Sequence, residues 1–305
     1  MPIFSPFWPL QKTKIPYIQD MLCYHTRIAP SPTGDMHLGT ARTAYFNWLA
    51  ARSHPEGQFY LRIDDTDAKR SDPKYTSAIY DVMLWLDLDV DHIVLQSERK
   101  GFYRHHAEDL VVRNKARIAN DGAIILHPDF KQESWTDMIG GEIEITFDDR
   151  SQINAGIPLI KKDGNPTYHF ACVCDDIDMR LNLVIRGVDH ITNTARQLAI
   201  YDAFCMTPPQ FAHVGLIHKD GKPLSKRDGA ASMLHYKDAG YDPDAMLNFM
   251  ARLGWGPSVD DKTTKLLPRE RMLELFLEGG KMRSSPANVD LKKLDSFDRK
   301  YKARK

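Results

Sequence analysis

Between residues 22 and 86 the chain alternates short apolar runs with longer segments of helical periodicity. Residues 22–30 favour a strand that runs into a turn, where Pro30 and Pro32 exclude a helix. A strand with alternating apolar residues is predicted at 58–63. The apolar faces of the two predicted helices are Ala41, Ala44, Tyr45, Trp48, Leu49 and Tyr75, Ile79, Val82, Met83, Leu86. This order predicts an α/β fold with a parallel sheet and crossover helices.

The rest of the chain extends this pattern and adds two further regions. We expect an irregular N-terminal extension (1–21), a first half of the α/β domain (22–104), a short α+β insertion (105–160), a second half (161–235) and a helical region (236–305). Within the insertion we predict a helix at about 105–119 and β-like pieces near 141–147. The second half contains a strand ending at Arg186-Gly187 and a helix from about Thr194. In the helical region we predict helices that begin after a cap at Asp242-Pro243 and near 268 and 290.

Composition excludes several classes of function. Lys plus Arg and Asp plus Glu both number 41 in 305 residues, so RNA binding has to come from a local patch. Such a patch is predicted at 281–305, where basic residues outnumber acidic ones; the alternative is a solvated tail. The four cysteines form no Cys-x-x-Cys pair, so we expect no metal and no structural zinc. No apolar run is long enough to span a membrane, and we expect a cytoplasmic monomer.

Two motifs carry candidate chemistry. His37-Leu38-Gly39-Thr40 lies between a predicted strand and a helix, where unpaired backbone N–H groups attract anions and a histidine can donate to phosphate. The segment 222–229 contains Lys222, Lys226 and Arg227, cations that suit a triphosphate as its charge shifts onto pyrophosphate. Alone, the first motif is also compatible with an ordinary strand-to-helix loop and the second with a solvated basic turn.

Together, these motifs and three further blocks resemble the glutamyl-tRNA synthetases, class I enzymes with a Rossmann-like nucleotide-binding fold. The resemblance runs from about Thr26 to Lys302 and is strongest in 26–34, 61–67, 166–171, 184–187 and the Leu224-Ser225-Lys226-Arg227 loop. It implies an ATP site made of Pro30, Gly34, His37, Gly39, Thr40, Leu224, Ser225, Lys226 and Arg227, with His37 and Lys226 catalytic. It also implies that ATP enters with Mg²⁺.

The resemblance also implies a glutamate pocket. Arg27 and Arg186 match arginines that bind the substrate's side-chain carboxylate, Ser31 and Tyr168 match hydrogen-bonding residues, and Asp64 matches a carboxylate that binds the α-ammonium group. A guanidinium fork suits a carboxylate because it makes two parallel charged hydrogen bonds. Two arginines at one small site favour glutamate over glutamine, whose amide would leave them without an anionic partner.

Several positions depart from the family pattern. Bacterial glutamyl enzymes usually have glutamate at the position of Asp64, many relatives have asparagine at the position of Cys172, and Pro223 stands where a lysine is expected. The insertion lacks the cysteine-containing segment of many relatives. The chain also stops soon after Asp290–Tyr301, so we expect a truncated enzyme without an anticodon-binding region.

The expected function is therefore activation of L-glutamate with ATP and transfer to tRNA bound through its acceptor arm and stem. Three alternatives remain open at this point. They are a relative that glutamylates queuosine in tRNA-Asp, a small nucleotidyltransferase with the same His-x-Gly signature, and a non-catalytic paralogue that binds RNA or a partner protein.

Overall fold

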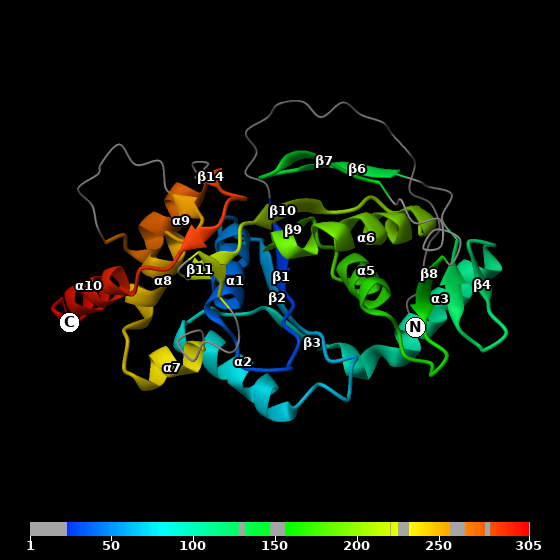
Figure 1. Cartoon of the computed structure of the whole chain (residues 1–305), viewed down its shortest axis with the longest axis horizontal. Coiled ribbons are helices and arrows are strands. Elements are labelled where there is room, and N and C mark those ends of the chain that lie inside the picture. The colour runs from blue at the N-terminus through cyan, green and yellow to red at the C-terminus, as the bar shows by residue number, and fades with distance from the viewer. Residues whose placement is uncertain are drawn as a thin grey trace.

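Five parallel strands form the centre of the molecule in the computed structural model (Figure 1). One group has the order β1 (His25–Ile28), β2 (Gln58–Ile63) and β3 (His92–Leu95), and the other pairs β9 (Leu183–Gly187) with β10 (Gln210–Val214). All three pairings are parallel, which confirms the predicted class of sheet. The structure describes residues 23–127, 132–146, 156–219, 221–224, 232–256, 266–277 and 281–304, and the N-terminal extension predicted at 1–21 lies outside them.

The two groups of strands meet at β1 and β9. Asn182, just before β9, donates its backbone N–H to the His25 carbonyl oxygen (3.3 Å), and its side-chain oxygen accepts from the His25 N–H (2.8 Å). Since the starts of β1 and β9 touch, both strands end at the same edge. The chain continues outward from β1 to β2 and β3 on one side and from β9 to β10 on the other, so the β1–β9 boundary is the point where strand order reverses.

The helices of the described residues lie on this sheet and beside it. They are, with two short 3₁₀ turns, α1 (Leu38–Arg52), α2 (Pro73–Trp85), η1 (Gln96–Arg99), α3 (Lys100–Val112), α5 (Tyr168–Asp178), η2 (Val188–His190), α6 (Ile191–Ala203), α7 (Met233–Asp238), α8 (Pro243–Ala251), α9 (Arg269–Leu277) and α10 (Leu291–Lys302). Within the described residues, no helix is both long and apolar enough to cross a membrane. The predicted face of α2 is confirmed, because Ile79, Val82 and Met83 are buried.

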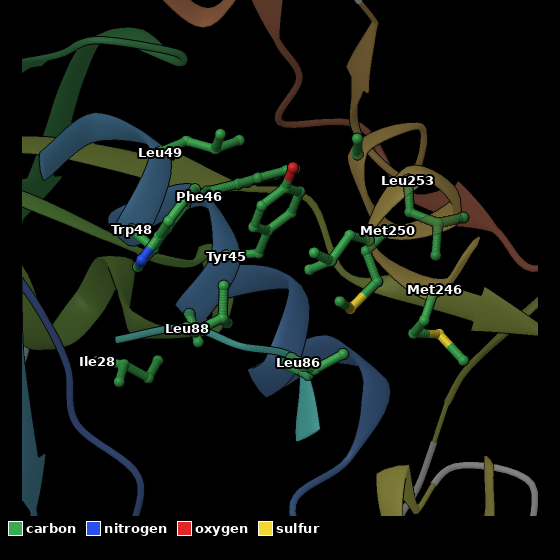
Figure 2. Close-up of a cluster of buried hydrophobic side chains, with 14 of the residues drawn as sticks. Ile28, Tyr45, Phe46, Trp48, Leu49, Leu86, Leu88, Met246, Met250 and Leu253 are labelled. Atoms are coloured by element: carbon green, nitrogen blue, oxygen red, sulfur yellow. The ribbon is translucent and has the colours of Figure 1, made fainter. Parts of the chain in front are cut away.

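Burial of α1 is more extensive than its sequence predicts. One apolar face is expected, but Arg42, Thr43 and Asn47 on the other side are buried as well. The physical reason is that α8 and α9 pack against α1 on the side away from β1 and β9. Figure 2 shows side chains of α1 between Ile28 and the α8 residues Met246 and Met250. Arg42 is bonded within this core, donating to the carbonyl oxygens of Gly215 (2.8 Å) and Leu253 (3.1 Å).

The region between the two halves of the sheet has its own small core. It contains β4 (Ala116–Ile118), β5 (Ile124–Leu126), β6 (Gln132–Asp137), β7 (Gly141–Thr146) and β8 (Ile157–Ile160). Strands β4, β5 and β8 form an antiparallel sheet that packs with α3 and α5, while β6 and β7 form a separate hairpin above β10 (Figure 1).

The predicted helix at 105–119 is displaced in the structure, where α3 begins at Lys100 and ends at Val112. Asn114 adopts φ 58°, and the N–H of Lys115 returns to the Leu110 carbonyl oxygen at 2.9 Å. Asparagine tolerates this left-handed geometry, which ends helices, so the chain turns into β4 instead of continuing the helix.

The C-terminal region is helical, with short strand pairings that the sequence does not reveal. Asp242 caps α8 by accepting from the N–H groups of Asp244 and Ala245, and Gly254 follows with φ 95°, as predicted. The expectation of a wholly helical region is wrong, because β13 (Trp255–Gly256) pairs with β14 (Lys281–Met282). In addition, β15 (Ala287–Asn288) joins β11 (Ile217–Lys219), which also pairs with β12 (Lys222–Pro223). These pairings have two residues each, too few to show an alternating pattern.

Candidate active site

A cavity of about 490 Å³ opens where β1 and β9 end. Its wall includes most of the residues that the sequence predicted for the site: Arg27, Pro30, Ser31, Gly34, His37, Gly39, Thr40, Tyr168, Arg186 and Leu224. Open α/β sheets bind ligands outside the carboxyl ends of their strands, at the point where strand order reverses. The β1–β9 boundary is such a point, so the topology itself explains why segments distant in sequence meet here.

Arg186, the last but one residue of β9, is a buried cation held by neutral groups. Its Nε donates to His213 Nε2 (3.2 Å), and its Nη2 donates to Thr194 Oγ1 (2.6 Å) and Gln197 Oε1 (2.8 Å). Only 6% of the residue is exposed, and burial lowers the pKa of its guanidinium. Among the described residues no carboxylate forms an ion pair with Arg186.

Arg27, on β1, is buried beside an acidic partner that it shares. Its Nε lies 3.6 Å from Asp176 Oδ1, and that same oxygen accepts from Arg62 Nη1 at 2.6 Å. The Arg27 Nε has no hydrogen-bond partner among the described residues. Arg27 and Arg186 therefore both reach the cavity wall, and neither is neutralised by an acidic partner of its own.

Asp64 is not at the cavity wall among the described residues, although the sequence predicted it to bind the substrate's ammonium group. Its Oδ1 accepts from Arg62 Nε (2.7 Å), and its Oδ2 faces the Cys172 thiol (3.7 Å). Burial raises the pKa of the Cys172 thiol, so the thiol keeps its proton and can donate. Arg62, which sequence reasoning missed, also donates to the Cys172 sulfur (3.2 Å). The sequence did contain a sign of this ion pair, because Arg62 and Asp64 are two residues apart at the end of β2 and their side chains therefore point to the same side of the strand.

Tyr168 and Ser31 reach the cavity from different elements. Tyr168 begins α5, and its hydroxyl lies 3.3 Å from His190 Nδ1. Burial lowers the pKa of His190 to about 4, so this imidazole is neutral near pH 7. Ser31 is exposed in the turn after β1. The cavity thus presents hydroxyl groups and a neutral ring beside the two guanidinium groups.

His37 caps the helix that the first motif begins. Its Nδ1 accepts from the N–H groups of Gly39 (3.1 Å) and Thr40 (3.3 Å), and its Nε2 lies 3.2 Å from Thr40 Oγ1. The expectation that these backbone donors are unpaired is therefore wrong for Gly39 and Thr40. Because Nδ1 accepts, the neutral ring carries its proton on Nε2. A Cβ on Gly39 would lie 3.1 Å from the His37 ring, so glycine allows this close capping contact.

The second motif is only partly described. Leu224 and Pro223 line the cavity, and the Leu224 N–H donates to the Ile217 carbonyl oxygen (2.8 Å). Ser225, Lys226 and Arg227 lie outside the described residues. The cavity wall also carries the carboxylates of Asp35 and Asp189, which the sequence analysis did not single out.

Away from the cavity, one group of possible metal ligands comes together that sequence spacing did not predict. The ligand atoms of Cys23, His54 and Glu56 lie within 4.8 Å of one another. His54 Nδ1 accepts from the Glu56 N–H (3.1 Å), so this nitrogen has a partner in the protein.

Comparison with known proteins gives one consistent family. The model described as "tRNA synthetases class I (E and Q), catalytic domain" matches residues 24–126 and 123–301. A curated relative, glutamate–tRNA ligase 2 of Neorickettsia sennetsu, is 42% identical over 278 residues, which cover 90% of this chain and 65% of the relative. Glutamate–tRNA ligase 1 of Acidiphilium cryptum is 38% identical, with 82% of this chain and 60% of the relative covered. The chain thus spans about two thirds, or less, of these relatives' length.

Solved structures agree with this result. The crystal structure of a glutamate–tRNA ligase from Elizabethkingia meningosepticum, in complex with its amino acid, matches with a TM-score of 0.81 at 26% identity. The match covers 93% of this chain and 70% of that one. A putative arginyl-tRNA synthetase from Campylobacter jejuni shares the fold, with a TM-score of 0.52 and 14% identity.

Proposed function

Because the chain belongs to the class I tRNA synthetase family whose catalytic domain acts with glutamate or glutamine, we propose that it activates L-glutamate with ATP and transfers the glutamyl group to tRNA. The observation that carries the choice of amino acid is Arg186, a buried guanidinium whose described partners are all neutral. A buried charge is stabilised only when an opposite charge and hydrogen bonds compensate for its lost hydration. A carboxylate guest at the cavity wall supplies both.

Glutamine fits this site poorly for the same reason. Its amide presents one acceptor and two donors, and a donor facing Arg186 or Arg27 leaves guanidinium N–H groups unpaired. A site built to bind a charged group rejects an analogue without that charge by a large factor, since the site's own polar groups then remain unsatisfied. Tyr168 and Ser31 add hydroxyl groups that can bind the rest of the amino acid.

In the first step of the proposed reaction, the glutamate α-carboxylate attacks the α-phosphorus of ATP, and pyrophosphate leaves. The protein supplies position and charge stabilisation rather than a nucleophile. His37 Nε2–H, which lies 3.2 Å from Thr40 Oγ1, is a donor that a phosphate oxygen can share with that hydroxyl, and Lys226 has the charge to stabilise the departing phosphates. ATP enters as its magnesium complex. Mg²⁺ is commonly held by phosphates and one or two carboxylates, and Asp35 and Asp189 fit that second part.

In the second step, a hydroxyl of the terminal tRNA ribose attacks the activated carboxyl carbon, and AMP leaves. We assign stem contact to the helical region at 236–305. Exposed Lys292, Lys293, Arg299 and Lys300 on α10 suit phosphate contacts, which position an RNA without reading its sequence.

An ATP–pyrophosphate exchange assay, with and without tRNA, tests the proposal. Glutamate should support exchange at least about 10²-fold better than glutamine. Equal exchange with both amino acids would contradict the assignment of Arg186. Exchange with neither, under both conditions, would favour the non-catalytic alternative, and exchange without glutamylation of tRNA-Glu would favour the queuosine-modifying one.

A further inference from the structure

A buried carboxylate on the insertion hairpin reaches the back of the candidate site. Asp137 ends β6, only 2% of it is exposed, and its Oδ2 lies 2.5 Å from His213 Nδ1 on β10. Its Oδ1 accepts from the N–H groups of Ile139 (3.0 Å) and Gly140 (2.8 Å). Burial alone would raise the pKa of Asp137, but hydrogen bonding to His213 and to these backbone N–H groups outweighs it and lowers the pKa, so this carboxyl is ionised.

These contacts dictate which nitrogen of His213 carries the proton. An ionised carboxylate only accepts hydrogen bonds, so His213 must donate from Nδ1. Burial lowers the pKa of His213, and the neutral ring then has its lone pair on Nε2. That nitrogen faces Arg186 Nε at 3.2 Å, and a guanidinium only donates. The opposite tautomer would place two N–H donors against each other.

We propose that Asp137 is a positioning residue for the substrate carboxylate, and that it acts through His213 on Arg186. This Asp137–His213 relay rests on the proposed function, since it gives Arg186 the orientation needed to bind glutamate. With Nε held by His213 and Nη2 by Thr194 and Gln197, the guanidinium cannot rotate, and Nη1 makes no hydrogen bond to the described residues. The hairpin therefore contributes to substrate recognition without touching the substrate.

The competing explanation is that Asp137 only anchors the hairpin. It caps the turn between β6 and β7, and the adjacent Met138 N–H donates to the Phe211 carbonyl oxygen (2.8 Å). An anchor would affect stability and every kinetic constant alike. A relay affects the glutamate KM and leaves the ATP KM unchanged, so the two explanations can be separated.

The test compares Asp137→Asn with Asp121→Asn. Asp121 belongs to the same insertion and also accepts from a backbone N–H, that of Ala123 (3.2 Å), but it is exposed and is not bonded to His213. In Asp137→Asn the amide oxygen is retained by the backbone N–H groups, so the NH₂ group faces His213 Nδ1 and moves the ring proton to Nε2. The glutamate KM in pyrophosphate exchange should rise about tenfold or more, while the ATP KM changes less than about twofold. Asp121→Asn should match the wild type.

A double-mutant cycle provides the second measurement. His213→Phe removes the acceptor for Arg186 and should raise the glutamate KM as Asp137→Asn does. If Asp137 acts only through His213, the double variant Asp137→Asn/His213→Phe should be no worse than His213→Phe alone. Additive effects, or equal changes in the glutamate and ATP KM values, would overturn the relay.

The ring proton can also be observed without any activity. Nitrogen-15 NMR should find His213 neutral with its proton on Nδ1 in the wild type and on Nε2 in Asp137→Asn, the signal being assigned by its loss in His213→Phe. A wild-type Nε2–H tautomer would overturn the relay even in an active enzyme. Absence of glutamate-dependent exchange in the wild type, by contrast, would refute the proposed function, and the NMR result would still decide the geometry.

Discussion

Replacing Arg186 with methionine should separate the function of this residue from its effect on stability. In the free protein the guanidinium is buried and donates three hydrogen bonds to neutral groups, with no acidic partner among the described residues. Methionine has similar length and no charge. The variant loses those bonds but no longer buries an uncompensated cation, and Thr194 Oγ1 and His213 Nε2 can still bond to each other (3.0 Å).

The magnitudes follow from these contacts. Hydrogen bonds to charged groups contribute about 1.5–3 kcal/mol each, so losing two bonds to the substrate carboxylate should lower kcat/KM for glutamate about 10²-fold or more. Methionine removes the cost of burying an uncompensated cation but leaves the buried Gln197 Oε1 without its donor, so the free energy of unfolding should fall by no more than about 1–3 kcal/mol.

Arg62→Met is the matched control. Arg62 is also buried but is paired with Asp64 (2.7 Å) and Asp176 (2.6 Å), so its removal leaves Asp64 without a cationic partner among the described residues and Asp176 with only Arg27 at 3.6 Å. Breaking such a pair costs about 3–5 kcal/mol. Urea unfolding and pyrophosphate exchange on both variants give the comparison. The reasoning is refuted if Arg186→Met retains wild-type activation of glutamate, or if it destabilises the protein as much as Arg62→Met does.

Three further predictions concern other parts of the molecule. Lys226→Ala should lower the exchange rate about 10²-fold while the circular dichroism spectrum stays unchanged, and full activity would mean that its loop is a solvated turn. Burial lowers the pKa of His169 to about 4, below its unfolded value near 6.5, so its neutral form stabilises the protein above about pH 6.5 and this contribution is lost as pH falls towards 4. Chemical denaturation across that range should therefore show a steeper loss for the wild type than for His169→Gln, and identical slopes would contradict the assignment. Lys292→Glu/Lys300→Glu should raise the tRNA KM and flatten its salt dependence but leave the glutamate KM unchanged, whereas an unaltered tRNA KM would mark α10 as a solvated helix.

Local patterns predicted much of the sheet and of the cavity wall. The family resemblance implied that Arg27 and Arg186 share one pocket, and both lie at the cavity wall beyond the ends of parallel strands. What sequence did not reveal depends on long-range contacts. Asp137 and His213 lie 76 residues apart and pair only after the hairpin folds over β10.

The sequence also did not predict the direction that individual side chains take. Asp64 directly follows a strand whose end points to the site, but the neighbouring Arg62 binds it and turns it away from the cavity wall. The backbone N–H groups at the start of α1 were predicted to be unpaired and open to an anion, yet His37 Nδ1 accepts from two of them. In both cases a competing partner within the chain decided the outcome.

The packing of α1 also bears on how this protein can be divided. A boundary drawn near residue 235 separates two patterns in the sequence, but the side chains on either side of it belong to one continuous core, with Arg42 bonded to carbonyl groups from both parts. A shorter chain that ends before α8 would leave α1 with an apolar surface facing water and a guanidinium missing one of its acceptors. The helical region is therefore not an interchangeable module, and recombination between relatives should exchange α1 and α8 together.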